Sequence, residues 1–327
     1  MQIYTNNAGI SLPLAVFLAS DDYDYESGVI SVTSLMRPIR QLILGYRVPR
    51  EENPVDVSAL VASRMGSAIH TAIEKAWLTN KDKALADLGY PQHIIDRVLV
   101  NPTDEELAAV VNPITVYMEQ RAYKEIMGYK ISGKFDFVAE GRVEDFKSTS
   151  VYNYINQSNA KKYPIQGSLY RWLSPHIITK DFMKIHYVFT DWSKVDALSR
   201  PNYPPQRVMT QEFKLMSLEE TERYVMSRLA LINKYRDEDE INIPHCTDEE
   251  LWRKPASWKY YKDPNKTSGR STKNFDNATD AFARFRDDGG TGVVLEVKGQ
   301  VSACKYCNAF NICTQKDQLI VSGDLVL

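Results

Sequence analysis

The chain has few cysteines and no strong excess of either charge, and both shortages limit what it can be. Only four cysteines occur in 327 residues, which does not indicate a disulfide-stabilised scaffold in a chain of this length. Lys and Arg number 40 against 42 Asp and Glu, so the formal net charge of -2 provides no overall nucleic-acid-binding signature. Any attraction to nucleic acid must therefore come from local patches.

The chain also lacks a long apolar run, an internal repeat and a low-complexity segment. Its apolar N-terminal stretch, residues 10–20, contains a proline, follows no basic region and precedes an acidic run. This stretch is too short to span a bilayer and is a poor signal peptide. We therefore expect an intracellular protein without a membrane partner.

The bulk composition is typical of a globular protein. Hydrophobic residues make up 43% and charged residues 25% of the chain, and this length allows one large domain or two. The composition shifts after the acidic run 237–240. We predict a boundary near residue 241, which separates a core over residues 1–240 from a C-terminal part over 241–327.

The periodicity of apolar residues predicts an α/β core with a mixed sheet flanked by helices. Strands are expected at 129–140, 142–149, 183–192 and 206–215. Helices are expected at 31–46 (interrupted by Pro38), 57–78, 103–127, 163–174 and 217–236. Thr103 with Glu106, and Ser217 with Glu220, fit capping boxes at two helix starts.

Two strand-like runs carry the most informative residues. The first places Asp136 after Gly133, and the second contains Asp145 and Lys147 two residues apart. Side chains i and i+2 of a strand share a face, so Asp145 and Lys147 point the same way. If the runs pair as a hairpin, Asp136 lies near Asp145. Two carboxylates beside an ammonium suit a hard divalent cation and an anionic substrate, as phosphodiester hydrolysis requires.

The neighbouring motifs give this pair a context. Gly66-x-x-x-His70 lies upstream, and Gln166-x-x-x-Tyr170 lies downstream. The order G-x-x-x-H, G-x-x-D, D-x-K-S and Q-x-x-x-Y, over roughly residues 31 to 190, resembles the RecB-like branch of the PD-(D/E)XK nucleases. The resemblance implies a restriction-endonuclease-like core with a mixed β-sheet and metal-dependent cleavage of DNA.

The resemblance also implies roles for the site residues. Asp136, Asp145, His70 and the backbone carbonyl of Phe146 would bind Mg²⁺ or Mn²⁺, and the histidine suits Mn²⁺ better. Lys147 would orient the attacking water or stabilise developing charge. Gln166 and Tyr170 share a helix face and would contact DNA or brace Lys147. Glu74, one turn after His70, is expected at the surface, and the alternative is that it reaches a second metal.

All four cysteines lie in the last third of the chain, at Cys246, Cys304, Cys307 and Cys313. The C-x2-C spacing with a third cysteine nearby indicates a metal site, although buried free thiols remain an alternative. Spacing alone favours zinc. The pattern of a distant cysteine before C-x2-C-x5-C also resembles the iron–sulfur clasp of AddB-type and CRISPR-associated RecB-like nucleases, which implies a structural [4Fe–4S] cluster.

Residues 252–275 combine basic and aromatic side chains. The cations are Arg253, Lys254, Lys259, Lys262, Lys266, Arg270 and Lys273, and the rings are Trp252, Trp258, Tyr260, Tyr261 and Phe275. Cations that follow a phosphate backbone and rings that stack on bases favour single-strand binding. The alternative is a solvated loop whose rings pack on the core. The segment also resembles phage-encoded members of the superfamily.

Together these motifs predict a metal-dependent DNA exonuclease in recombination, replication or repair. We expect a DNA substrate with a free end or single-stranded character, a recombination or replication partner protein, and a cytoplasmic location in a bacterial cell, with a phage-encoded origin. The alternatives are an inactive DNA-binding or scaffold protein on a nuclease fold, a flap or single-strand endonuclease, and an RNA-directed nuclease.

Overall fold

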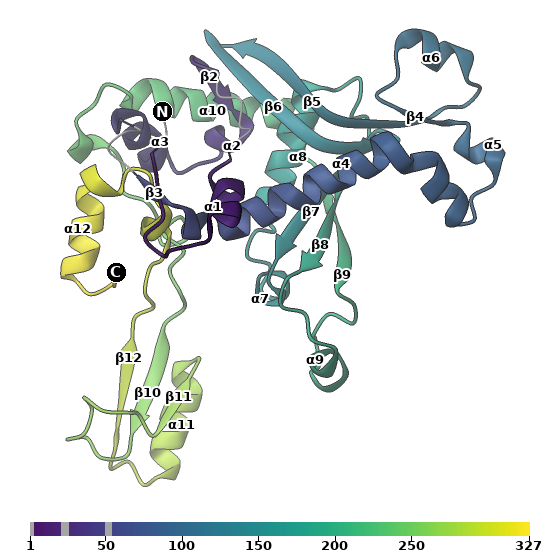
Figure 1. Cartoon of the computed structure of the whole chain (residues 1–327). Helices are drawn as coiled ribbons and strands as arrows, with labels where there is room; N and C mark the ends of the chain where they lie inside the picture. The colour runs from purple at the N-terminus through teal and green to yellow at the C-terminus, as the bar shows by residue number, and fades with distance from the viewer. Residues whose placement is uncertain (1–2, 21–25, 50–53) are drawn as a thin grey trace. The chain divides into compact units, whose positions relative to one another are not determined.

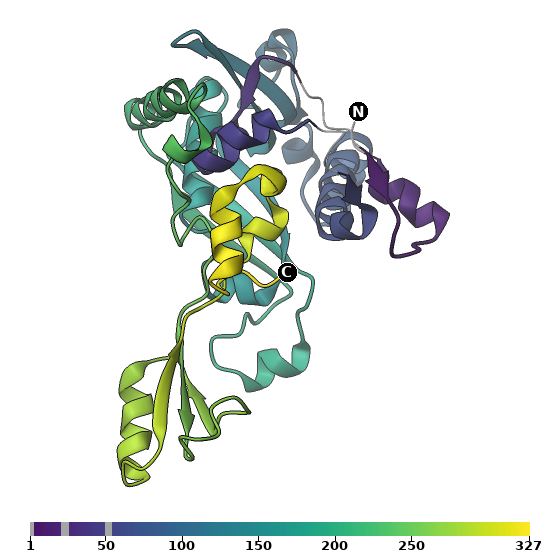
Figure 2. The same ribbon diagram turned by 90° about the vertical axis from the view of Figure 1, so that its left-hand side faces the viewer.

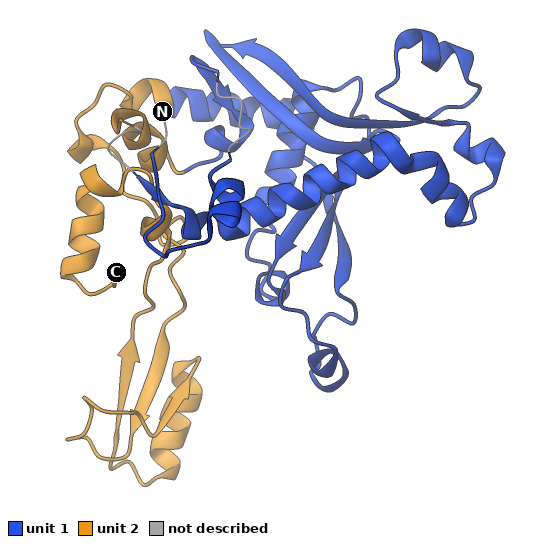
Figure 3. Cartoon of the chain, in the orientation of Figure 1, with its two compact units in different colours: residues 1–37, 54–231 blue, residues 38–53, 232–327 orange. Residues whose placement is uncertain are grey.

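The computed structural model describes residues 3–20, 26–49 and 54–327. The chain divides into two compact units, residues 1–37 with 54–231 and residues 38–53 with 232–327 (Figure 3). The division falls between Leu231 and Ile232, inside one helix, whereas composition indicated a boundary near residue 241. The second unit therefore includes a segment from far upstream in the sequence.

The first unit contains a mixed sheet with helices against it (Figure 1). The strands of the first unit are β1 (Tyr4–Thr5), β2 (Val29–Ser31), β3 (Val55–Asp56), β4 (Val98–Val100), β5 (Ile114–Ile126), β6 (Tyr129–Ala139), β7 (Arg142–Thr149), β8 (Phe182–Phe189) and β9 (Val208–Lys214). Its helices are α1 (Leu12–Ala19), α2 (Val32–Leu35), η2 (Val57–Leu60), α4 (Val61–Asp87), α5 (Gln92–Ile95), α6 (Asp104–Ala109), α7 (Val151–Ile155), α8 (Lys162–Leu173) and α9 (Lys194–Ser199). Helix α10 (Leu218–Tyr235) crosses the division.

The sheet has the order β4-β5-β6-β7-β8-β9, and β2 pairs with β6 beside this path. The pairs β5–β6, β6–β7 and β8–β9 are antiparallel, whereas β4–β5, β7–β8 and β2–β6 are parallel. The mixed sheet is therefore confirmed. The four predicted strands correspond to β6, β7, β8 and β9, and two predicted helices correspond to α8 and α10.

The helix predicted over residues 103–127 is wrong beyond its first turns. Thr103 and Glu106 do form the capping box, but α6 ends at Ala109. Asn112 then adopts a positive φ of 52° before Pro113, and residues 114–126 form β5. Residues such as Met118 and Glu119 are good helix formers, but pairing with β6 along nearly the whole strand outweighs this local preference.

The other N-terminal helix predictions are confirmed with shifted bounds. Ser31 accepts a hydrogen bond from the Ser34 amide as the cap of α2. Pro38 separates α2 from the next helix, as expected. The helix predicted at 57–78 begins as the 3-10 turn η2 and continues as α4 to Asp87.

Helices α4 and α8 pack on opposite faces of β7. Phe146 lies in edge contact with Phe137, which in turn contacts Trp77 of α4. The next residue, Lys147, lies over the ring of Tyr163 in α8. Successive strand residues point to opposite faces, so the site strand is sandwiched between these two helices.

Two glycines set the close approach of α8 to the sheet. A Cβ on Gly133 of β6 would lie 2.7 Å from Leu173 Cδ1 and 3.1 Å from Tyr170 Cδ1, both on α8. A Cβ on Gly167 of α8 would lie 2.5 Å from Met183 Sδ of β8. All three distances are below ordinary van der Waals contact, so larger side chains would push the helix outward.

The second unit joins an upstream helix to the C-terminal third of the chain. Its elements are α3 (Ile39–Arg47), η3 (Glu240–Asn242), β10 (Ser257–Tyr261), β11 (Lys273–Phe275), α11 (Ala278–Asp287), β12 (Val293–Val297), η4 (Ala303–Tyr306), η5 (Phe310–Ile312) and α12 (Thr314–Val321). The antiparallel sheet β11-β10-β12 packs against α11 (Figure 2). A separate core contains Leu251, Val301, Cys304, Leu319 and Leu325.

Among the described residues, no helix combines the length and apolar character needed to cross a membrane.

We predict that Gly133→Ala lowers the free energy of unfolding by about 1–3 kcal/mol, because the added methyl group overpacks the interface with α8. Gly66→Ala in α4 is the matched control, since a Cβ there meets nothing within 4 Å. The control gains about 0.5–1 kcal/mol, the helix preference of Ala over Gly. Urea denaturation measures both values, and equal effects of the two substitutions would refute the packing argument.

Candidate functional site

The β6–β7 hairpin brings the two predicted carboxylates together. In its register Phe137 pairs with Glu144 and Val138 with Val143, so Asp136 and Asp145 follow on neighbouring strands. The two carboxyl groups are close enough that each shifts the pKa of the other. The hairpin geometry expected from the two runs is therefore present.

Lys147 forms an ion pair with Asp145 on the same face of β7. Its Nζ donates to Asp145 Oδ1 at 3.0 Å and lies 2.7 Å from Oδ2. The second contact is an ion pair without hydrogen-bond geometry, so this buried oxygen has no hydrogen bond within the described residues. The Asp145 side chain is 2% exposed. The Lys147 ammonium is therefore the partner of a carboxylate that is almost completely buried.

The pKa values of the two carboxyl groups shift in opposite directions. Burial raises the pKa of Asp145, and Asp136 raises it further although Lys147 opposes both effects. Burial also disfavours ionised Asp136, but the hydrogen bond and charge of His70 outweigh it and lower that pKa. Burial alone would lower the pKa of Lys147, yet the Asp145 charge holds it above its usual value. An additional cation would favour ionisation of both carboxylates.

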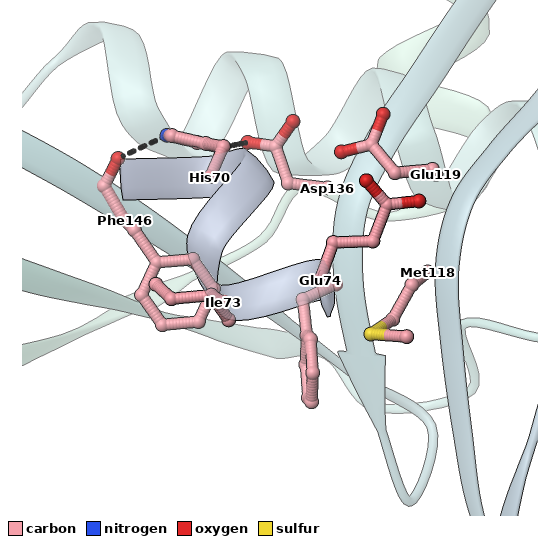
Figure 4. A pocket seen from close by; sticks show the side chains of 8 residues that line it. His70, Ile73, Glu74, Met118, Glu119, Asp136 and Phe146 are labelled. Atoms are coloured by element: carbon pink, nitrogen blue, oxygen red, sulfur yellow. Dashed lines mark hydrogen bonds and ion pairs between the residues drawn. The ribbon is translucent and has the colours of Figure 1, made fainter. Parts of the chain in front are cut away.

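His70 of α4 contacts two of the other groups assigned to the metal (Figure 4). Its Nδ1 lies 3.2 Å from Asp136 Oδ2, and its Nε2 lies 2.8 Å from the Phe146 carbonyl oxygen. The hydrogen bond with Asp136 is the main cause that raises the His70 pKa. His70, Asp136 and the Phe146 carbonyl therefore meet at one place, although they come from three different elements.

Gln166 and Tyr170 lie on the same face of α8, as their spacing predicts. Gln166 Nε2 donates to the Tyr170 hydroxyl at 2.9 Å. Tyr170 is buried, and burial followed by the Asp136 charge raises its pKa. The ring near Lys147 belongs to Tyr163, at 5.9 Å from Nζ. Sequence reasoning missed Tyr163, although it lies one helical turn before Gln166 on the same face.

Glu119 is a second residue that sequence reasoning missed. It lies opposite Asp136, where the β5–β6 ladder is interrupted between the pairs Met118–Phe137 and Gln120–Phe135. Its φ is +53°, a left-handed conformation that is costly for a residue with a Cβ. Its carboxylate pairs with Lys134 at 2.5 Å. The sequence does not predict this positive φ, because glutamate rarely adopts the left-handed conformation.

A small pocket opens beside these groups. It is lined by His70, Ile73, Glu74, Met118, Glu119, Asp136, Phe137 and Phe146. Figure 4 shows the carboxylates of Glu74 and Glu119 near that of Asp136. Glu74 is half-buried and lines this pocket, so the alternative that it reaches a second metal stays a prediction.

Glu144 and Phe146 point to the other face of β7, as the alternation predicts. Glu144 is 6% exposed and accepts hydrogen bonds from Arg142 at 2.6 Å. His186 of β8 contacts Glu144 through Nε2 at 2.6 Å and Thr210 through Nδ1 at 2.9 Å, and its ring stacks on Phe146. This network fixes β7 on the face opposite the carboxylate site and gives His186 a structural role.

The four cysteines belong to the second unit and none forms a disulfide. Burial raises the pKa of the Cys246 thiol to about 12, and Cys313 and Cys307 contribute to the shift. Burial also raises the pKa of Cys304, with contributions from Cys307 and Cys313. The thiols therefore lie close enough to influence one another, although Cys246 is distant in sequence.

The basic-aromatic segment divides into core and surface residues. Tyr260 and Tyr261 are 0% and 5% exposed, and the Tyr260 hydroxyl donates to Asp288. These two rings are buried side chains of strand β10, so the expectation that they stack on bases is wrong for them. Trp252 remains 49% exposed, and Lys262 is exposed at the end of β10.

As they stand, no three His, Cys, Asp or Glu side chains in the described ranges form a group that could hold a metal ion. The carboxylate site and the thiols are metal-site candidates on their donor types and mutual contacts alone.

No protein-family model matches the chain, and no curated protein matches it. The solved structure of SSO0001 is 17% identical, with a TM-score of 0.40, and the match covers 67% of this chain and 84% of that chain. A phage-related exonuclease from Haemophilus somnus 129PT is 16% identical, with a TM-score of 0.29, and the match covers 66% and 95%. Both TM-scores are too low to support an inference about this chain.

We predict that Glu119→Gly is more stable than Glu119→Ala by about 1 kcal/mol, because only glycine adopts the positive φ without strain. Both variants lose the ion pair with Lys134, so their difference isolates the backbone term. The control is Glu125 in the same strand, which is not among the positive-φ residues. There the Ala variant is expected to be the more stable, and denaturation curves that rank Ala first at both positions would contradict the strain argument.

Proposed function

We propose that the first unit is a divalent-metal-dependent nuclease with a PD-(D/E)XK core of the RecB-like type, and that it cleaves DNA from a free end. The observation that carries the proposal is the placement of Asp136 and Asp145 on neighbouring strands, with Asp136 Oδ2 3.2 Å from His70 Nδ1 and Lys147 Nζ 3.0 Å from Asp145. Structural ion pairs rarely bury two carboxylates side by side, because the like charges repel.

The donor set fits a hard divalent cation. Asp136, Asp145 and the Phe146 carbonyl would supply oxygen ligands and His70 a nitrogen ligand, which allows Mg²⁺ or Mn²⁺. Burial and the neighbouring Asp136 carboxylate both disfavour ionised Asp145, and a bound cation would favour it. When bound, the cation would polarise the scissile phosphate and lower the pKa of an attacking water.

The chain's own residues have separate tasks. Lys147 is held by Asp145 and by the ring of Tyr163, so its ammonium can bind a phosphoryl oxygen where negative charge develops. Gln166 and Tyr170 brace this side through their mutual hydrogen bond. The Glu144–His186 network keeps the backbone of β7, and hence the Phe146 carbonyl, in place.

The second unit is proposed to carry a structural metal site on Cys246, Cys304, Cys307 and Cys313. Four thiols that influence one another support a [4Fe–4S] cluster or, alternatively, Zn²⁺. Hydrolysis needs no electron transfer, so the role of the metal would be structural. It would join Cys246 to the C-terminal segment that carries the other three cysteines. Exposed Trp252 and Lys262 remain candidates for contact with a single DNA strand.

We predict that Asp145→Asn lowers the cleavage rate of linear DNA by at least about 10³-fold, because a ligand for the cation is lost. The unloaded variant keeps its melting temperature, since a carboxylate repulsion disappears together with the Lys147 ion pair. The rise in melting temperature that Mn²⁺ or Mg²⁺ gives the wild type is expected to vanish.

The control is Glu140→Gln, an exposed carboxylate at the turn of the same hairpin. It is expected to retain cleavage and metal-induced stabilisation. Wild-type rates of Asp145→Asn on every nucleic acid would overturn the site. Cleavage of closed circular single strands as fast as linear ones would instead replace the exonuclease by an endonuclease.

We also predict that protein purified without oxygen is brown and contains about four irons per chain, as a [4Fe–4S] cluster requires. Cys307→Ser is expected to lose the iron and to destabilise the second unit, because the metal closes a long loop. Iron analysis and the visible spectrum measure both effects. Colourless protein with one tightly bound zinc would select the zinc alternative, and metal-free protein would exclude both.

A further inference from the structure

Arg40 is a cation buried deep in the second unit, where several partners hold its guanidinium group. It lies in α3, one of the upstream residues included in this unit, and is 2% exposed. Its Nη1 donates to the carbonyls of Ile243 at 2.8 Å and Glu240 at 3.3 Å. Its Nη2 pairs with the Glu240 carboxylate. These contacts satisfy most of the guanidinium and fix its plane.

The remaining donor points at a cysteine. Arg40 Nε lies 3.3 Å from Cys313 Sγ, within hydrogen-bond distance for sulfur. Glu240 Oε1 also accepts from the amide and hydroxyl of Thr314, the next residue, at 2.8 and 2.9 Å. The backbone after Cys313 and its sulfur are therefore both held by the Arg40–Glu240 pair.

We propose that Arg40 is a positioning residue for the four-cysteine site, in which its Nε–H donates to the Cys313 sulfur and its fixed charge stabilises the ligated thiolates. This inference depends on the proposed metal at these cysteines. Arg40 contacts the Cys313 sulfur, and an arginine would not itself bind the metal, so it would act on the site through Cys313.

The packing of α3 supports this role. A Cβ on Gly45, one turn further along α3, would lie 2.4 Å from Asn308 Nδ2, and Asn308 follows Cys307 directly. Helix α3 therefore approaches the cysteine loop closely at two points, Arg40–Cys313 and Gly45–Asn308. This approach requires a residue without a side chain at position 45.

The chemistry of metal-bound thiolates gives the contact its effect. Cysteine binds a metal as the anionic thiolate, so four such ligands concentrate negative charge in a buried place. Hydrogen bonds to the sulfurs and nearby positive charge favour the more negative, reduced state of an iron–sulfur cluster. Arginine keeps its charge when buried, whereas lysine loses its proton more readily.

The test compares wild type, Arg40→Lys, Arg40→Gln and Arg47→Lys in the full chain, all purified without oxygen. Arg47→Lys is the matched control: it changes the same helix, and Arg47 donates to the carbonyls of Tyr235, Arg236 and Glu238, none of which belongs to a cysteine. The readouts are iron or zinc retained against a chelator and, for iron, the midpoint potential and visible spectrum. Circular dichroism verifies the fold of each variant.

We expect both Arg40 variants to lose metal about 10–100-fold faster than wild type, the usual cost of removing an outer partner of a ligand. The midpoint potential of an iron–sulfur cluster should fall, and further for Arg40→Gln than for Arg40→Lys. Arg47→Lys should match wild type in both measurements. Folded Arg40 variants with wild-type retention and potential would overturn the inference while leaving the metal site intact.

A measurement on wild-type protein covers variants that do not fold. With ¹⁵N-labelled arginine, the electron spin echo of the reduced cluster should show a coupling to one arginine nitrogen, and its absence would refute the hydrogen bond. If wild-type protein binds zinc, the test is the ¹⁵N chemical shift of Arg40 Nε, compared between zinc-loaded and zinc-stripped protein. An unchanged chemical shift would refute the hydrogen bond. Metal-free wild-type protein would instead overturn the proposed cysteine site itself.

Discussion

The register of the β6–β7 hairpin is the constraint on which the candidate site depends. It pairs Phe137 with Glu144, which places Asp145 and Lys147 toward α8 and Glu144 toward His186. A slip of one residue would send every side chain of β7 to the other face. Both faces resist such a slip, because Glu144 is buried in its own hydrogen-bond network on one side and Asp145 is paired on the other.

Unfavourable features are concentrated around this hairpin. Two carboxylates lie side by side, one buried carboxylate oxygen has an ion pair but no hydrogen bond, and Glu119 adopts a left-handed conformation opposite Asp136. Each feature costs free energy and persists only where the surrounding structure enforces it. Here the enforcing contacts are the tight packing of α8 at Gly133 and Gly167 and the hydrogen bonds of His70. Such a concentration is typical of a site that binds a charged ligand.

The second unit solves a different problem, which is to join segments that are far apart in sequence. Arg40 connects α3 to Glu240 and Ile243 and to the sulfur of Cys313. A buried arginine is tolerated only when its donors are satisfied, so this residue holds three segments in one arrangement. The thiols of Cys246 and Cys313 then influence each other despite the long loop between them.

The sequence by itself determined the strands β6 to β9, helix α8 and the shared face of Asp145 and Lys147, because these follow from periodicities of two and 3.6 residues. The prediction of a helix over the residues of β5 is wrong, because pairing with β6 holds these helix-forming residues extended. The sequence could not reveal Glu119, Tyr163 or Arg40, since their roles arise from contacts with residues distant along the chain. Local pattern encodes which face a side chain takes, whereas only tertiary packing decides which side chains meet there.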